Sequence, residues 1–251
     1  EATIEDHQTL ARYRVVTGNI DGAVAAYDAA RAMEDPKERP VTREVADLLF
    51  ARNLPDRALP FYRELFEGNQ EDAVVGLRLA ETLLRLGQQA EAQPLLDRFE
   101  QRNESRLLQA MTQRAEAETA RREGRAEDAE KHRQEAITLL EEALAADANN
   151  GQVRLQLALT LMQDEATAGR ARELLSEAVR LNPQLADARA ALADLHLREG
   201  RTNDAVRELR VLVEQQPGNA QVRGRLAPVL MQTGDASGAE PLLRPGAEPH
   251  S

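Results

Sequence analysis

The sequence contains no cysteine and no tryptophan, and aromatic residues make up only 3% of its 251 positions. Without cysteine the chain can build neither a disulfide framework nor a thiol site, an absence that fits cytosol and periplasm equally. With so few aromatic rings, the core has to be made of leucine, alanine and valine. Small aliphatic side chains of this kind favour closely packed helix pairs over a sheet sandwich.

Positive charge is in short supply as well. The chain has 32 Lys and Arg against 43 Asp and Glu, a net charge of −11. Such a surface repels nucleic acid and anionic membranes on average. No apolar run approaches the roughly 20 residues of a membrane-spanning helix. We therefore expect no nucleic-acid partner and no direct insertion of this segment into a membrane.

Catalytic motifs are lacking too. None of the four histidines has a second histidine at i, i+4 with a glutamate between them, and there is no G-x-G-x-x-G, P-loop or G-x-S-x-G sequence. The segment Asp147–Gly151 starts like a calcium loop but lacks the later ligands, so we interpret it as a helix-ending turn. We interpret His196 as a packing residue and His132 as a solvated one. The sequence predicts a non-enzyme with no catalytic residue, cofactor or metal.

What the sequence does contain is an internal repeat of about 34 residues. In most copies a glycine is expected to turn the chain between two helices, as at Gly200, and alanines are expected where those helices cross, as at Ala193 and Ala205. The clearest copy carries Leu192, Ala193, Gly200, Ala205, Leu209, Leu212 and Pro217, and the next repeats it at Leu226, Ala227, Gly234, Ala239 and Leu243. Turns are predicted at Gly18, Asn53, Gly87, Gly124, Gly200 and Gly234.

This order of residues on this period resembles the tetratricopeptide repeat family, and the match covers nearly the whole chain. The resemblance implies an all-α fold, a right-handed α-α superhelix of about seven helix-turn-helix repeats forming a single array over residues 1–251. The repeats are expected at about 4–38, 39–72, 73–104, 105–148, 151–185, 186–219 and 220–244. For function the resemblance is less specific, because this scaffold serves many partners.

The fourth copy is longer than the others. Its apolar pattern is extended by seven residues, about two helical turns, which predicts a second helix at Ala126–Ala146 and a lengthened first helix at about Ser105–Glu123. This hairpin is either a partner-docking site, a bend in the array or tolerated length variation. The fifth copy lacks the turn glycine and is expected to have a longer connection over Asp164–Arg170.

The seventh copy is degenerate. Pro228 is expected to interrupt its first helix, and Pro245 and Pro249 to end its second. Pro60, Pro94 and Pro241 share one early position in their helices, where proline is tolerated. Because no polar capping helix follows Leu243, either another segment follows in the full protein or a partner covers this end, and we expect truncation. The chain does not start with Met, so we expect an excised fragment or a processed form.

In this family the first helices of successive repeats line a concave groove that holds a partner segment, and by resemblance the same face is expected to bind here. Apolar residues in the third and fifth repeats favour a hydrophobic segment, unless these side chains pack against a neighbouring helix. The family's groove positions correspond to Gln8, Arg12 and Val15, then Arg43, Asp47 and Phe50, then Leu77, Glu81 and Leu84, then Leu155, Leu159 and Met162, then Asp187, Asp194 and Leu197.

One use of the family, the clamp for the carboxylate tail of a chaperone, is not expected. That clamp needs Lys and Asn donors, whereas this chain has Gln8 and Arg12, then Glu44, then Val74 and Arg78. Too few donors remain, and Glu44 would repel a carboxylate.

Three functional hypotheses remain. The first is a non-catalytic scaffold for a protein or peptide partner. In the second, the usage of Ala, Leu and Arg is similar to repeat regions of bacterial exopolysaccharide export proteins of the cellulose type. That resemblance implies a periplasmic scaffold in an envelope synthase and export complex, and it favours the periplasm over the cytoplasm. The third is the targeting arm of a larger enzyme.

Overall fold

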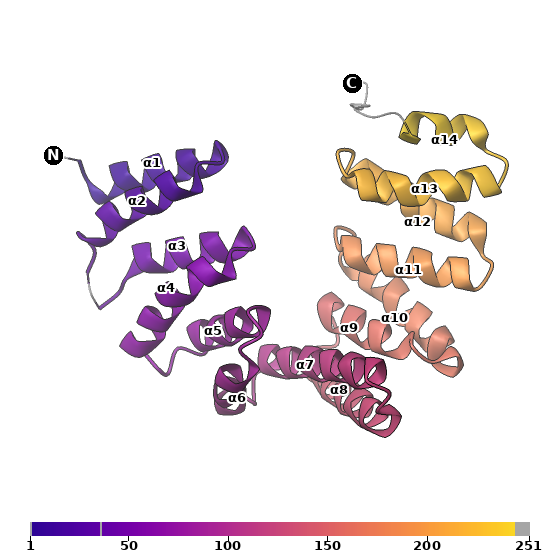
Figure 1. Cartoon of the computed structure of the whole chain (residues 1–251), viewed down its shortest axis with the longest axis horizontal. Helices are drawn as coiled ribbons and strands as arrows, with labels where there is room; N and C mark the ends of the chain where they lie inside the picture. The colour runs from indigo at the N-terminus through magenta and orange to yellow at the C-terminus, as the bar shows by residue number, and fades with distance from the viewer. Residues whose placement is uncertain (1, 36, 244–251) are drawn as a thin grey trace. The chain divides into compact units, whose positions relative to one another are not determined.

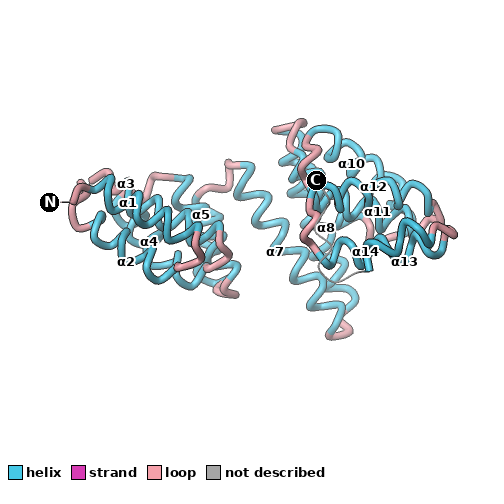
Figure 2. Tube along the Cα trace, turned by 90° about the horizontal axis from the view of Figure 1, so that it is seen from above, coloured by secondary structure: helices cyan, strands magenta, loops and turns pink. Residues whose placement is uncertain are grey.

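The computed structural model describes residues 2–35 and 37–243, and within them all regular structure is helical (Figures 1 and 2). This confirms the all-α prediction. The helices are α1 (Ile4–Val16), α2 (Ile20–Arg31), α3 (Pro40–Ala51), α4 (Pro55–Gly68), α5 (Ala73–Arg85), α6 (Gln89–Arg98), α7 (Asn103–Arg122), α8 (Ala126–Ala146), α9 (Gly151–Leu161), α10 (Ala168–Leu181), α11 (Ala186–Arg198), α12 (Thr202–Gln215), α13 (Ala220–Gln232) and α14 (Ala236–Leu243), with a 3₁₀ turn, η1 (Glu165–Thr167).

The helices form hairpins because the predicted turn residues adopt left-handed backbone conformations. Gly200 has φ +71° and joins α11 to α12, a conformation that costs a residue with a Cβ atom about 1–2 kcal/mol. Asn53 takes the same role between α3 and α4 at φ 57°. All six turn predictions are confirmed, the other four residues being Gly18, Gly87, Gly124 and Gly234.

Within the hairpins, the predicted alanines are buried where two helices meet. Ala193 in α11 and Ala205 in α12 are both fully buried. Without a larger side chain between them, the two helix backbones can approach closely. The same holds for the pairs Ala11 and Ala23, Ala46 and Ala58, Ala80 and Ala92, Ala158 and Ala171, and Ala227 and Ala239.

The packing of the chain divides it into two units, Glu1–Leu108 (unit 1) and Gln109–Ser251 (unit 2), and the division falls inside α7. Unit 1 has one continuous core around Tyr27, Leu49, Tyr62 and Leu96. In unit 2, α11 to α14 share a core cluster that includes Leu209, Leu212 and Leu226. The single continuous array over residues 1–251, with its repeat boundaries, stays a prediction.

The lengthened hairpin was predicted closely. α8 spans the expected Ala126–Ala146, and α7 begins at Asn103, two residues before the expected start. Ala129 and Ala136 are both buried, as are Leu140 and Ala143 further along α8. The extra seven residues therefore return the apolar side chains to the same helix face, as a two-turn insertion should.

Two predictions about the helices were wrong. The connection in the fifth copy ends earlier than Arg170, because η1 leads directly into α10 at Ala168. Pro228 lies inside a continuous α13. Proline has no backbone N–H group, so the carbonyl group of Gly224 loses its helical hydrogen-bond donor. Pro228 and Gly224 are both exposed, and water can therefore hydrate this carbonyl group instead. Pro60, Pro94 and Pro241 are within helices, as predicted, whereas Pro245 and Pro249 lie outside the described residues.

Candidate functional site

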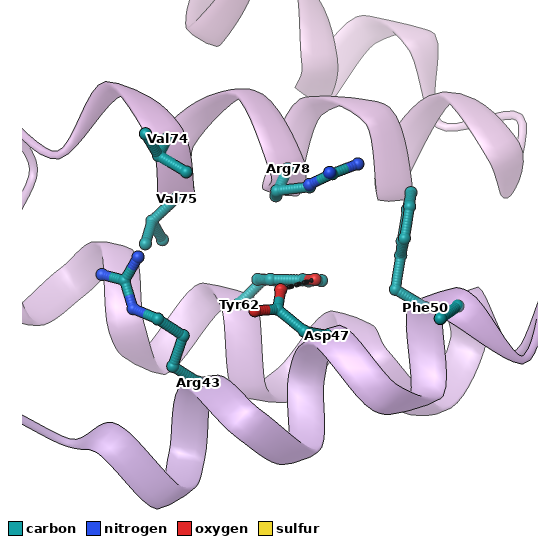
Figure 3. A pocket seen from close by; sticks show the side chains of 8 residues that line it. Arg43, Asp47, Phe50, Tyr62, Val74, Val75 and Arg78 are labelled. Carbon is teal, nitrogen blue, oxygen red and sulfur yellow. Dashed lines mark hydrogen bonds between the residues drawn. The ribbon is translucent and has the colours of Figure 1, made fainter.

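Three of the predicted groove residues lie together in a pocket between α3 and α5 of unit 1. Figure 3 shows Arg43, Asp47 and Phe50 on one helix, facing Val74, Val75 and Arg78 on the other. The pocket has a volume of about 520 Å³, and its lining residues are Arg43, Asp47, Phe50 and Ala51 from α3, Tyr62 from α4, and Val74, Val75 and Arg78 from α5. The spacing 43, 47, 50 places the three α3 side chains on one helix face.

The floor of the pocket is a buried tyrosine. The Tyr62 hydroxyl donates a hydrogen bond of 2.6 Å to Oδ1 of Asp47, and its ring meets Phe50 edge-on with 6.1 Å between ring centroids. Burial and the neighbouring Asp47 carboxylate raise the pKa of Tyr62. The phenol therefore keeps its proton and holds Asp47 in place as an acceptor.

The wall formed by α5 carries two arginines over the Phe50 ring. The guanidinium carbons of Arg85 and Arg78 lie 3.9 and 5.1 Å from the ring centroid. Both arginines also donate to Glu81, with distances of 2.8 and 3.0 Å. Cation–π contacts at partly exposed sites contribute about 0.5–1 kcal/mol each. Glu81 thus acts by positioning two cations on the aromatic side chain of the pocket.

The first turn of α5, next to the pocket, is fixed by its N-cap residue, Asp72. Asp72 accepts hydrogen bonds from the backbone N–H groups of Val74 and Val75, and it forms an ion pair with Arg43 at 2.6 Å. Burial acts to raise the pKa of Asp72, but the bonds from Arg43 and the two N–H groups outweigh it and lower the pKa. Arg43 therefore links α3 to the start of α5.

A second polar cluster joins α1 to α3. The Glu44 carboxylate accepts from Gln8 Nε2 at 2.5 Å, Arg12 Nε at 2.7 Å and the Tyr27 hydroxyl at 2.9 Å. Burial acts to raise the pKa of Glu44, but these three donors outweigh it and hold the pKa below its ordinary value. Burial and the bond to Glu44 raise the pKa of Tyr27 to about 12.

These carboxylates predict a pH dependence for unit 1. Since the pKa values of Glu44 and Asp72 are lower in the folded chain, their stabilisation is present above about pH 4 and is lost as pH falls through the folded values. We expect the melting temperature to fall on acidification, and to fall less steeply in Glu44→Gln than in the unsubstituted chain. Thermal denaturation at several pH values measures both slopes, and equal slopes would contradict this role for Glu44.

The apolar groove residues turn out differently from the polar ones. Leu77 lies in the core of unit 1 and Leu155 is fully buried in unit 2, so neither faces a groove, because the packed helices cover them. Val15 is buried in the same way. Leu84 is half-buried against the unit 1 core, and Leu197 against the α11–α14 core of unit 2. These side chains therefore pack against neighbouring helices, which was the alternative to a groove lining in the sequence analysis.

The remaining predicted positions lie in unit 2 and are not among the lining residues of the two pockets described there. Leu159 and Met162 are half-buried, and Asp187 is exposed. Asp194 forms an ion pair with Arg225 of α13. The predicted groove residues are thus brought together in unit 1, at Arg43, Asp47 and Phe50, with Arg12 and Glu81 in the adjoining ion pairs.

Sequence reasoning missed the contributions of Tyr62, Val74 and Arg85. A usable signal existed for Tyr62, because it follows Tyr27 by 35 residues, the offset between the first two copies. In each copy the hydroxyl of that second-helix tyrosine bonds a carboxylate of α3, Glu44 for Tyr27 and Asp47 for Tyr62. Two tyrosines in register therefore mark the side of unit 1 where the polar groups gather.

The histidines are structural in different ways. His196 is buried, as predicted, and burial together with nearby Arg201 lowers its pKa. His132 is not simply solvated, because its Nδ1 lies 2.6 Å from Oε1 of Gln113 in α7. Asp147 caps α8 and Asn150 caps α9, which confirms the turn. In residues 2–35 and 37–243, no group of three acidic, His or Cys side chains is placed to hold a metal ion.

Comparison of the amino-acid sequence with models of protein families agrees with this helical architecture. Models described as tetratricopeptide repeats match residues 9–72, 164–218 and 198–250. The chain belongs to the tetratricopeptide repeat (TPR) family. TPR arrays act as scaffolds for protein interaction, and their repeats are generally non-catalytic. No helix of the described TPR chain is both long and apolar enough to cross a bilayer.

Solved structures share the TPR fold. TTC0263, a thermophilic TPR protein of Thermus thermophilus, is 23% identical, with a TM-score of 0.65 over 76% of this chain and 97% of its own. A chain in the Cut9–Hcn1 hetero-tetramer of the APC/C is 16% identical, with a TM-score of 0.64 over 91% of this chain and 43% of its own. At these identities the likeness shows the fold alone. No curated protein matches the chain.

Proposed function

We propose that this TPR chain is a non-catalytic scaffold whose unit 1 binds an extended segment of a partner protein along α1, α3 and α5. The observation that carries the proposal is the pocket between α3 and α5. It combines aromatic and aliphatic walls, Phe50 and Val74, with hydrogen-bonding groups at Arg43 and Asp47. Pockets that bind peptides have this composition, since apolar area supplies affinity and a few polar groups fix orientation.

Val74 supports the proposal because it is a large apolar side chain left exposed at the pocket. Val74 is the second residue of α5 and is 65% exposed, whereas the next residue, Val75, is buried. Covering such a side chain releases about 25 cal/mol for each Å² of apolar surface removed from water. A partner side chain seated between Val74 and Phe50 would obtain this energy, while Asp47 and Arg43 would bond its backbone.

The experiment is a selection of short random peptides, displayed on phage, against the purified chain. We expect enriched peptides, and we expect Val74→Gln to weaken their binding about fivefold to tenfold by replacing an apolar contact with a polar one. The control is Met231→Gln in α13 of unit 2, an apolar side chain that is 60% exposed and lies outside unit 1. It should leave binding unchanged.

The proposal fails if no peptide is enriched, or if every enriched peptide binds Val74→Gln as tightly as the unsubstituted chain. Circular dichroism of both variants checks that the helices are intact. The envelope scaffold of the exopolysaccharide type and the targeting arm of a larger enzyme stay hypotheses, because neither the fold nor the pocket has a feature specific to them.

A further inference from the structure

One buried side chain of unit 2 differs in chemical kind from its equivalents in other repeats. His196 lies in α11, three residues after Ala193, the alanine at the helix crossing. In four other repeats this position holds a leucine that is at most 2% exposed. These residues are Leu49, Leu83, Leu161 and Leu230. His196 therefore puts a polar, titratable ring where the repeat otherwise buries an aliphatic side chain.

One ring nitrogen of His196 has no hydrogen-bond partner among the described residues. The residue is 7% exposed, and its Nδ1 is buried without a donor or an acceptor. In a neutral imidazole one ring nitrogen is a donor and the other is an acceptor. A buried polar atom without a partner has lost the hydrogen bonds that water would give it. At this position histidine is therefore less stabilising than the leucine of the other repeats.

The ring borders a pocket of about 330 Å³ that is lined mostly by charged side chains of three consecutive helices, α10, α11 and α12 (Figure 1). The charged lining residues are Arg172 from α10, Arg201 at the N-cap of α12, and Asp204, Arg207 and Glu208 from α12. The helices α9 and α13 also reach α11, but they add no residue to this described lining. The pocket gives water, and with it protons, access to the imidazole.

The three carboxylates nearest to the ring are already paired with arginines, at distances of 2.6 to 2.7 Å. The pairs are Glu199 with Arg172, Asp204 with Arg201, and Glu208 with Arg189. Asp204 has a second arginine partner in Arg207, and Glu199 has one in Arg201 at 3.7 Å. Four arginines thus meet three carboxylates. A positive charge on the imidazole would therefore find no carboxylate in this cluster without a cation of its own.

We propose that His196 is a proton-operated switch in unit 2: when its imidazole takes up a proton, the packing of α11 against α10 and α12 loosens. The inference does not depend on the peptide pocket of unit 1. A protonated ring adds a fifth cation to the four arginines, at a buried position where loss of hydration also disfavours charge. The neutral ring is compatible with the packed helices, so the packed form is favoured at neutral pH.

The direction of the pH response follows from the same surroundings. Burial lowers the pKa of His196 most, and Arg201 lowers it further, whereas the nearby carboxylates act in the opposite direction without outweighing these effects. Because the folded pKa lies below the ordinary value of about 6.5, a loosened α11 takes up the proton first as the pH falls. The stability of this packing is therefore complete above about pH 6.5 and decreases as the pH falls from there toward the folded pKa.

The test measures hydrogen–deuterium exchange of the whole chain by mass spectrometry, as protection factors at about pH 7.5 and about pH 5.5. We expect protection in α11 and α12 to be about threefold to tenfold lower at the acidic pH, and protection in α4 of unit 1 to stay the same. His196→Leu, which installs the residue of the other repeats, should abolish the decrease, and so should His196→Gln. The matched control is His132→Leu, which removes a different histidine of unit 2 and should keep the decrease.

Arg201→Gln tests the surroundings of the ring. It removes a cation that lowers the pKa of His196 and leaves Glu199 and Asp204 with fewer arginine partners, so the decrease in protection should become smaller. The proposal is overturned if the unsubstituted chain shows no decrease, or if His196→Leu keeps it. It is also overturned if an NMR titration of the folded chain shows the imidazole of His196 becoming protonated at or above about pH 6.5. Peptide binding to unit 1 tests the proposed function separately.

Discussion

Replacing Ala193 with leucine is expected to lower the free energy of unfolding by about 2–3 kcal/mol. Ala193 is fully buried in α11 against α12, in a cluster that holds Leu209, Leu212 and Leu226. Three added carbon atoms have no space there, so the helices must separate or the neighbours must leave their preferred rotamers. Urea denaturation followed by circular dichroism measures the loss.

The control for this prediction is Ala145→Leu, the same chemical change at an exposed position near the end of α8. It should shift the free energy of unfolding by less than about 0.5 kcal/mol, because exposed helix positions tolerate leucine. If Ala193→Leu were as stable as this control, close approach of the two helices at Ala193 would not be what sets the hairpin geometry.

Replacing Phe50 with alanine is expected to cost about 3 kcal/mol of stability and to remove one wall of the pocket. The side chain is only 8% exposed and belongs to the core of unit 1. Its ring also meets Tyr62 edge-on and lies beneath the guanidinium of Arg85, whose central carbon is 3.9 Å from the ring centroid. The substitution therefore loses buried area, an aromatic pair and a cation–π contact together.

Phe50→Leu separates these contributions, because leucine refills most of the volume but has no ring. We expect it to lose about 1–1.5 kcal/mol, at most half the cost of Phe50→Ala. Urea titrations of the two variants against the unsubstituted chain give the difference. Equal losses in the two variants would mean that the ring, and not the buried volume, accounts for the contribution of Phe50.

Much of the fold follows from the sequence, because close crossings and left-handed turns accept few residue types. Ala193, Ala205 and Gly200 recur at fixed offsets for that reason, and Asn53 could replace glycine since asparagine tolerates positive φ. Pro228 was misjudged because its cost depends on whether the carbonyl group of Gly224 can reach water. The amino-acid sequence alone does not show whether this carbonyl group is exposed to water.

The site was predictable only where one helix supplies its residues. Arg43, Asp47 and Phe50 were predicted because they match the groove positions of the TPR family on one helix, and the structure puts them in one pocket. Tyr62 comes from a different helix, so no spacing on α3 could predict its position. Leu77 and Leu155 share the periodicity of groove residues but are buried, because a periodic pattern does not tell whether a neighbouring helix covers a side chain.

The hairpin arrangement also has a consequence for how the chain acquires its structure. The helices that pack together are almost all neighbours in the chain, such as α1 with α2, α3 with α4 and α11 with α12. Contacts between such neighbours require only short loops to close, and proteins rich in them fold within microseconds to milliseconds. Each hairpin can therefore close over a short stretch of chain, whereas the shared core of unit 1 is completed only when its hairpins stack on one another.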